Sequence, residues 1–315
     1  MTVSISQNRS AKVTLWLRQM RFPFITASIV PILVGSSAAF ATAGTFNLVL
    51  FILALVAIIC LNLGANMANE YFDHLSGNDW VNKNRGPFSG GTGLIQAGLT
   101  SPKAVLIAAW VAFAIGAMVG IVILLITRSR FILTLGLIGL GGGYFYTANP
   151  IRLGYRGAGE VVIGLLCGLG PVYGAYFLQT RSIDLVPLGP AVIISLLVFL
   201  VILINEFPDA EADAAVNKKT LVVLLGANTA AQIYRTALIL TYVAAIATAM
   251  SFEKMRLAGL LYLLTVPFAI AILRFLKTDT LAKSNRYRPN KLTILLHLTA
   301  GLLMSLGFII IGFSS

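Results

Sequence analysis

Carboxylate side chains are concentrated in two short segments of the chain. Residues 69–73 read Asn-Glu-Tyr-Phe-Asp, and residues 205–209 read Asn-Glu-Phe-Pro-Asp. Asp79 follows the first motif and Glu211 and Asp213 follow the second, so the two segments hold seven of the 11 Asp and Glu residues. Proteins commonly hold Mg²⁺ with one or two carboxylates while substrate phosphates complete its ligand shell. The two segments therefore predict a magnesium site.

Helical spacing would direct the acidic side chains of each motif to one side. Asn69 and Asp73 are four residues apart, as are Asp209 and Asp213, and such pairs share a face of an α-helix. We expect Asp79 to return toward Asp73 from a loop. Two facing carboxylate clusters repel each other unless a cation lies between them. The predicted magnesium ligands are Asp73, Asp79, Asp209 and Asp213.

The acidic residues have a simpler alternative role, as a solvated rim paired with nearby Lys and Arg. The presence of two matched motifs argues against it. Glu70 and Glu206 could instead point toward a neighbouring helix or a basic residue, so they are left outside the metal set. Pro208 predicts a kink or a new helical start within the second motif.

Basic residues follow each acidic motif. Lys83 and Arg85 follow the first, and Lys218 and Lys219 follow the second. Cationic side chains beside a metal-bound diphosphate stabilise the charge that develops as the diphosphate leaves. These four side chains therefore predict a diphosphate-bearing substrate, although membrane orientation and lipid headgroup contact would also account for each of them.

A glycine-rich segment, residues 141–150, carries two tyrosines and ends in Asn-Pro. Glycine allows helices to approach closely in membranes, which would turn Tyr144 and Tyr146 toward the acidic motifs. There their ring faces could stabilise a cation. An aromatic belt at the membrane interface is the competing interpretation. Arg152, in the loop that follows, could hold an anionic acceptor.

The elements that position these residues are membrane-spanning helices. The chain has 315 residues, of which 58% are hydrophobic and 11% are charged, and this composition is too apolar for a soluble domain. A spanning helix needs roughly 20 apolar residues, and a barrel strand would show only about ten of alternating character. We expect an all-α protein with about nine transmembrane helices in one bundle. The apolar runs are 22–44, 46–70, 103–127, 131–148, 159–180, 185–206, 229–250, 256–274 and 290–313.

The distribution of basic residues predicts the orientation of the bundle. Residues 1–21 form a basic leader that we expect to stay in the cytoplasm, ahead of a retained first helix. This orientation puts most Lys and Arg residues, and both acidic motifs, on the cytoplasmic side, in agreement with the positive-inside rule. Orientation accounts for the net charge of +12 without nucleic-acid binding. Residues 1–315 read as one domain in a bacterial-type cytoplasmic membrane.

At these motifs the chain resembles the UbiA-type intramembrane aromatic prenyltransferases, over nearly its whole length. The resemblance rests on residues 69–79, 144–147, 205–209 and 218–221, and is strongest to the 1,4-dihydroxy-2-naphthoate branch of menaquinone biosynthesis. Glu70 stands where that branch commonly has Asp, and Asn217 where it often has Gly. The family implies nine transmembrane helices and two Asp-rich motifs that bind Mg²⁺ and diphosphate.

The resemblance also implies a reaction. An allylic polyprenyl diphosphate would ionise with the help of Mg²⁺, and the carbocation would attack an electron-rich aromatic acceptor, replacing its carboxylate to give a demethylmenaquinone-type product. Asn69 and Asn205 would support the site. The four basic residues named above would contact the diphosphate, and the enclosing helices would exclude water, the competing nucleophile.

Other functions stay open at this stage. A cation-coupled secondary transporter is the main alternative class, because intramembrane acids often mark ion pathways. Transporter sites lie near the bilayer midplane, whereas these acids fall at helix ends, which favours prenyl transfer. Within the same fold, 4-hydroxybenzoate and homogentisate are alternative acceptors. The prenyl chain length, the oligomeric state and the roles of Glu211 and Arg235 are left open.

Overall fold

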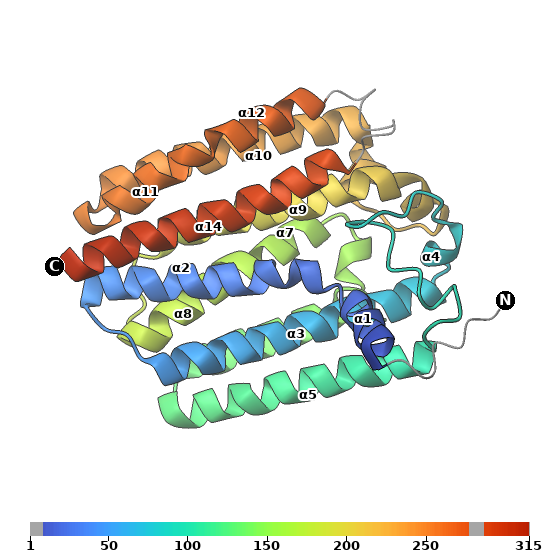
Figure 1. Ribbon diagram of the computed structural model, residues 1–315, viewed down its shortest axis with the longest axis horizontal. Coiled ribbons are helices and arrows are strands. Elements are labelled where there is room, and N and C mark those ends of the chain that lie inside the picture. Colours follow the sequence, from blue (N-terminus) through green and yellow to red (C-terminus); the bar gives the residue numbers. More distant parts are fainter. Residues whose placement is uncertain (1–8, 277–286, 315) are drawn as a thin grey trace.

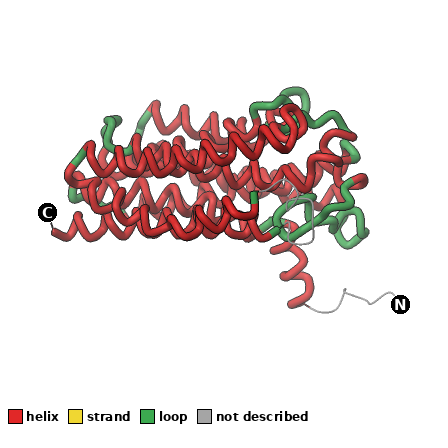
Figure 2. The backbone as a smooth tube through the Cα atoms, turned by 90° about the horizontal axis from the view of Figure 1, so that it is seen from above, coloured by secondary structure: helices red, strands yellow, loops and turns green. Residues whose placement is uncertain are grey.

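The computed structural model describes residues 9–276 and 287–314, and every regular element within them is helical. Figure 1 shows long helices lying side by side, and Figure 2 shows the bundle from above, with the N-terminal helix projecting near one end. The all-α prediction is confirmed. In chain order the elements are α1 (Arg9–Gln19), η2 (Phe22–Ile25), α2 (Thr26–Ala43), α3 (Leu48–Leu75), α4 (Asn78–Val81), α5 (Pro102–Thr127), α6 (Arg130–Phe145), η3 (Leu153–Tyr155), α7 (Gly159–Gly164), η4 (Leu165–Leu169), α8 (Gly170–Thr180), α9 (Leu188–Ala215), α10 (Leu221–Ser251), η5 (Glu253–Met255), α11 (Arg256–Tyr262), η6 (Leu263–Thr265), α12 (Val266–Phe275) and α14 (Arg288–Ser314).

Most of the predicted membrane segments form helices of spanning length. Within the described residues, eight segments are long and apolar enough to cross a membrane. The predicted run 131–148 forms α6 instead, whose 16 residues extend about 24 Å, less than the roughly 30 Å of a bilayer core. The chain is an integral membrane protein. The eight segments are Thr26–Ala43, Leu48–Leu75, Pro102–Thr127, Gly159–Thr180, Leu188–Ala215, Leu221–Ser251, Glu253–Phe275 and Arg288–Ser314.

The helices that carry the acidic motifs are longer than a bilayer requires. α3 and α9 each contain 28 residues, and this length corresponds to about 42 Å against an apolar layer of roughly 30 Å. Both helices run through their motifs and end beyond them, at the end of the bundle where α4 lies (Figure 1). Each motif therefore occupies the part of its helix that extends past the apolar run.

Pro208 lies inside α9 without ending it. Proline lacks an N–H group, so the carbonyl of Ile204, one turn earlier, loses its usual helical donor. The side-chain amide of Asn290, from α14, donates to that carbonyl at 3.1 Å. A neighbouring helix thus satisfies the freed acceptor, and the second motif stays helical rather than starting a new helix.

Small residues allow the central helices to approach closely. A Cβ atom at Gly35 of α2 would collide with the Val172 carbonyl of α8, and one at Gly301 of α14 would collide with Val30 of α2. Such contacts are typical of helix packing in membranes. Large apolar side chains point outward elsewhere, for example Met250 at 81% exposure, as a lipid-facing surface requires.

Candidate active site

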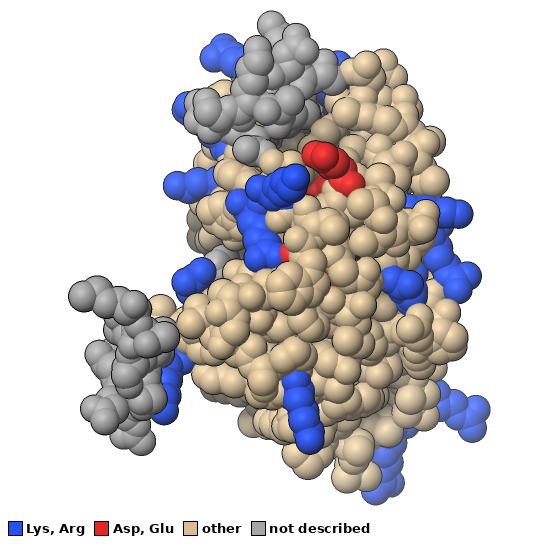
Figure 3. Space-filling view, turned by 90° about the vertical axis from the view of Figure 1, so that its right-hand side faces the viewer, with Lys and Arg blue, Asp and Glu red and all other residues tan. Residues whose placement is uncertain are grey.

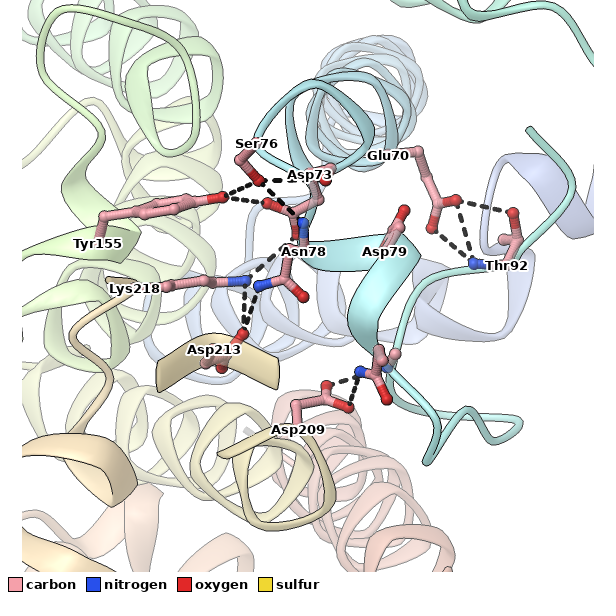
Figure 4. Close-up of polar contacts among 12 residues, drawn as sticks. Glu70, Asp73, Ser76, Asn78, Asp79, Thr92, Tyr155, Asp209, Asp213 and Lys218 are labelled. Carbon is pink, nitrogen blue, oxygen red and sulfur yellow. Dashed lines mark hydrogen bonds and ion pairs between the residues drawn. The ribbon is translucent and has the colours of Figure 1, made fainter. Parts of the chain in front are cut away.

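The two acidic motifs meet at one end of the bundle, above a cavity between the helices. Figure 4 shows α3, the short helix α4 and the end of α9 directing their polar side chains toward one another. On the visible part of this face the acidic atoms are confined to a small area, with Lys and Arg side chains around them (Figure 3). The four predicted metal ligands all line the cavity: Asp73, Asp79, Asp209 and Asp213.

Asp73, near the end of α3, is buried and makes two polar contacts. The Tyr155 hydroxyl donates to its Oδ1 at 2.6 Å, and the Lys218 ammonium donates to its Oδ2 at 3.2 Å. Burial, followed by the negative charge of Asp73, raises the pKa of Tyr155 to about 12. The phenol is therefore held in its neutral, donating form.

Asp213, in the last turn of α9, shares Lys218 with Asp73. The Lys218 Nζ atom lies 3.5 Å from Asp213 Oδ1, and the amide of Asn78 donates to the same oxygen at 2.6 Å. Burial alone would lower the pKa of Lys218, but the two carboxylates hold that pKa well above its usual range. One ammonium group thus offsets the repulsion between the two motifs.

Asp209, one turn before Asp213, is held by the loop that follows α4. The Asn82 amide donates to its Oδ1 and the Gly90 backbone N–H donates to its Oδ2, both at 2.9 Å. Gly90 adopts a φ of 76°, in the left-handed region that favours glycine. The loop thereby covers the second motif from the side of the first.

Asp79 belongs to α4 rather than to an irregular loop, and only 2% of it is exposed. Burial, followed by the negative charges of Glu70 and Asp73, raises the pKa of Asp79 to about 8. Arg85 lies behind it and donates to its backbone carbonyl. Gly91 packs against the Asp79 carboxylate, and an added Cβ there would lie 2.6 Å from Oδ1.

The two glutamates of the motifs lie in different surroundings. Glu70 accepts the Thr92 backbone N–H at 3.0 Å and the Thr92 hydroxyl at 2.7 Å, and Arg21 lies 3.2 Å from it. Glu206 is buried, and its Oε2 atom has no hydrogen-bond partner among the described residues. The buried Glu160 of α7 accepts the Leu221 N–H at 2.7 Å. Glu70 therefore joins the chain before α2 to the loop after α4.

The predicted substrate-binding residues differ in where their side chains lie. Lys218 lines the cavity, as do Asn69 and Asn205. The Lys83 and Lys219 side chains are exposed and line no part of it. Arg152 stacks on the ring of Tyr155, 3.6 Å from its centroid, also outside the cavity lining.

Of the two predicted catalytic tyrosines, one lines the cavity and the other does not. Tyr146 lines the cavity, and its pKa is raised by burial and by the negative charge of Glu206. Tyr144 packs instead among the rings of Phe72, Trp110 and Phe113. Of the two, Tyr146 is the ring that could face a bound cation.

Below its polar mouth the cavity lining becomes mostly apolar. Its deeper wall is formed by side chains from α3, α7, η4 and α9. A molecule with an anionic head and a long apolar tail matches this change of polarity along one cavity. The apolar lining residues include Ile58, Leu61, Ile163, Leu166, Val198 and Val201.

The donor set at the mouth of the cavity suits a hard cation. It consists of carboxylate and amide oxygens, the ligands that Mg²⁺ prefers. Within the described residues, no three His, Cys, Asp or Glu side chains come close enough to enclose a metal ion by themselves. Such a site fits Mg²⁺ when substrate phosphates supply the remaining ligands.

Three side chains of the site were not predicted from the sequence. Tyr155 contacts Asp73 from 82 residues away, and Asn78 and Asn82 donate to the second motif from either side of Asp79. The sequence has three asparagines within seven residues, at 78, 82 and 84, and this cluster could have indicated polar contacts with the acidic motifs. Tyr155 ends the short helix η3 and carries no comparable signal.

Comparisons with known proteins identify relatives of this arrangement. A model described as the UbiA prenyltransferase family matches residues 28–309. A Mycobacterium tuberculosis protein named 1,4-dihydroxy-2-naphthoate octaprenyltransferase is 31% identical, over 76% of this chain and 80% of its own. A Haemophilus influenzae protein of the same name is 32% identical, over 69% and 70%.

A solved structure shares the fold. It is that of a UbiA homolog from Archaeoglobus fulgidus bound to DMAPP and Mg²⁺, which superimposes with a TM-score of 0.69 at 16% sequence identity. The alignment covers 95% of this chain and 98% of that one.

Proposed function

The chain belongs to the UbiA prenyltransferase family, and from that premise we propose that it transfers a polyprenyl group from its diphosphate to 1,4-dihydroxy-2-naphthoate, with Mg²⁺ as cofactor. The observation that carries the proposal is the meeting of two aspartate motifs around Lys218, at the polar mouth of a cavity whose deeper lining is mostly apolar. A polyprenyl diphosphate has the same two parts.

The choice of acceptor draws on the named relatives. Proteins from M. tuberculosis and H. influenzae carry the name of a dihydroxynaphthoate octaprenyltransferase, and a Synechocystis relative, 25% identical over 93% of this chain, is named as a 2-carboxy-1,4-naphthoquinone phytyltransferase. Both names describe a bicyclic naphthalene skeleton, oxygenated at positions 1 and 4, with a carboxylate at position 2. This agreement favours the naphthoate over 4-hydroxybenzoate or homogentisate.

Asp73, Asp79, Asp209 and Asp213 are the residues that would hold the metal. When bound, Mg²⁺ supplies positive charge that stabilises the departing diphosphate. Asn78 and Asn82 fix two of the carboxylates by hydrogen bonds, so the ligands keep their orientation without the substrate.

The chain's own side chains serve the remaining steps. The C–O bond of the allylic diphosphate breaks, and its electron pair leaves with the diphosphate, near the Lys218 ammonium. The aromatic carbon bearing the carboxylate bonds to the allylic carbon, and carbon dioxide departs, returning its bonding pair to the ring. Tyr146 presents a ring that can stabilise the allylic cation. The enclosing helices keep water from it.

The site would open toward the cytoplasm. The net charge of +12 and the basic residues near both motifs favour this orientation under the positive-inside rule. Both substrates carry negative charge, so a cytoplasm-facing mouth lets them enter without crossing the membrane.

The test is an assay of the purified protein in detergent, with Mg²⁺, a polyprenyl diphosphate and either 1,4-dihydroxy-2-naphthoate or 4-hydroxybenzoate. Mass spectrometry then identifies any prenylated product. Product from the naphthoate, with loss of the mass of carbon dioxide, is the expected result. Product from the benzoate alone would assign a different acceptor, and no product from either would contradict the proposal.

A further inference from the structure

The cavity has a second polar wall, apart from the carboxylates. It is formed by the side chains of Arg21, just before α2, of Ser28 in α2, and of Asn62 and Asn66 in α3, all of which line the cavity. None of these residues belongs to the aspartate motifs, and the reaction as described above uses none of them.

Helical spacing places the asparagines in line with the first motif. Asn62, Asn66, Asn69 and Asp73 follow one another at intervals of four, three and four residues, which puts them on one face of α3. At about 1.5 Å per residue, Asn66 lies about 10 Å and Asn62 about 16 Å from Asp73 along the helix. The polar wall therefore begins beside the metal-binding end and continues toward the apolar part of the cavity.

The hydroxyl group of Ser28 is the part of this wall whose hydrogen bonding is incomplete. It is 1% exposed, and its hydroxyl has no hydrogen-bond partner among the described residues. A buried hydroxyl without a partner destabilises the folded protein. Because this hydroxyl lines a cavity, a ligand that enters the cavity can supply the missing contact.

The other side chains leave matching groups free for a ligand. Arg21 uses Nε for its contact with Glu70, and no hydrogen bond from its terminal Nη atoms is found within the described residues. The Asn66 amide nitrogen donates to Asn62 Oδ1 at 3.0 Å and to the Met20 carbonyl at 3.4 Å. The Asn62 amide nitrogen can therefore donate to a ligand, and the Asn66 carbonyl oxygen can accept from it. With the Arg21 cation and the Ser28 hydroxyl, the wall offers four groups to a ligand.

We infer that this wall binds the aromatic acceptor, with Arg21 holding its carboxylate and with Ser28, Asn62 and Asn66 holding its ring hydroxyls. The inference rests on the proposed function and adds the acceptor's binding site to it. A guanidinium group pairs with a carboxylate through two N–H donors. Neutral amides and a hydroxyl suit phenolic oxygens, which both donate and accept.

The diphosphate is a poorer ligand for this wall. Its expected contacts, Lys218 and the aspartates, lie around the joined motifs, whereas the part of the wall on α3 carries only the neutral side chains of Asn62 and Asn66. Arg152, which the sequence suggested for the acceptor, lies on the Tyr155 ring outside the cavity lining. Among the described residues, Arg21 is the arginine that lines the cavity.

The test measures KM separately for each substrate in Arg21→Gln and Ser28→Ala. Loss of a charged hydrogen-bonding partner costs about 1.5–3 kcal/mol, so we expect the KM for the naphthoate to rise about 10- to 100-fold in Arg21→Gln. The KM for the polyprenyl diphosphate should change less than about twofold. In Ser28→Ala we expect a rise of about fivefold for the naphthoate alone, since a neutral hydrogen bond contributes about 1 kcal/mol.

Ser36→Ala is the matched control, because Ser36 is also buried in α2, has no hydrogen-bond partner in the described part of the chain, and does not line the cavity. It should leave both KM values unchanged. Thermal melting separates binding from folding: removing the Ser28 hydroxyl takes away an unsatisfied group, so the melting temperature should not fall. A lower melting temperature with an unchanged acceptor KM would overturn the inference.

Two competitive inhibitors test the role of the carboxylate itself. Wild-type protein should bind 1-hydroxy-2-naphthoate at least about tenfold more tightly than 1-naphthol, and Arg21→Gln should lose this preference. A rise in the diphosphate KM instead would assign Arg21 to the other substrate and overturn the inference. Active wild-type protein with unaffected variants contradicts the inference alone, whereas wild-type protein that forms no product contradicts the proposed function and this site with it.

Discussion

The Tyr155 hydroxyl donates a 2.6 Å hydrogen bond to Asp73 Oδ1, across 82 residues of sequence. The other oxygen of Asp73 contacts Lys218, which also reaches Asp213. A tyrosine at the end of η3 and a lysine in the loop before α10 together orient the first aspartate of the site. This arrangement makes Tyr155 a positioning residue for a group that would hold the metal.

Tyr155→Phe removes the hydroxyl with little change in shape. A hydrogen bond to a charged group contributes about 1.5–3 kcal/mol, so kcat/KM for the polyprenyl diphosphate should fall about 10- to 100-fold. The apparent affinity for Mg²⁺ should fall with it. Tyr71→Phe is the control, because Tyr71 packs on Phe72 in the same helix as Asp73. Equal kinetics for the two variants would show that the Tyr155 hydroxyl does not position Asp73.

Asp73→Asn and Asp209→Asn each remove one negative charge with little change in volume. We expect turnover to fall at least about 100-fold, because outer-shell changes alone commonly cost 10- to 100-fold at metal sites. The proteins should still purify as folded membrane proteins. Glu211→Gln, an exposed residue on the same helix as Asp209, is the control. Full activity in either aspartate variant would show that its carboxylate is dispensable.

The adjacent lysines 218 and 219 should differ strongly. Lys218→Gln removes the cation between the two motifs, and loss of one charge-stabilising donor typically costs about 100-fold or more in kcat. Lys219→Gln changes an exposed side chain and should cost less than about tenfold. Steady-state kinetics at saturating Mg²⁺ make the comparison. Equal losses would mean that both lysines contact the diphosphate.

Glu70→Ala should loosen the loop between α4 and α5. It leaves Arg21 and the Thr92 N–H without their buried acceptor, at a cost of about 1–3 kcal/mol for each unsatisfied group. We expect a lower melting temperature and faster tryptic cleavage after the exposed Lys83. Glu211→Ala should show neither change. If trypsin cleaves the loop at the same rate in Glu70→Ala and Glu211→Ala, then Glu70 does not stabilise the loop.

The sequence was sufficient for the helical architecture, whereas the site at the ends of α3 and α9 stays a prediction. Apolar run length predicts spanning helices, and matched motifs in two of them predict a shared site. It could not show that α9 continues past Pro208, since the donor that satisfies Ile204 comes from Asn290, 86 residues away.

The choice between adjacent lysines also depended on tertiary structure. Lys219 pairs with Arg156 in an isolated bridge, and its N–H donates to the Tyr155 carbonyl at 3.3 Å. Neighbouring side chains on an extended backbone point to opposite sides. That pairing turns Lys218 toward the aspartates and Lys219 toward solvent, and no local pattern in the sequence encodes the pairing.

The most direct test of metal-dependent prenyl transfer uses carboxyl-labelled 1,4-dihydroxy-2-naphthoate with the purified protein in liposomes. With Mg²⁺ and a polyprenyl diphosphate, labelled carbon dioxide and prenylated product should form in equal amounts. EDTA should stop both, and added Mg²⁺ should restore them. Label that stays on the acceptor, or product that forms unchanged in EDTA, would contradict the account.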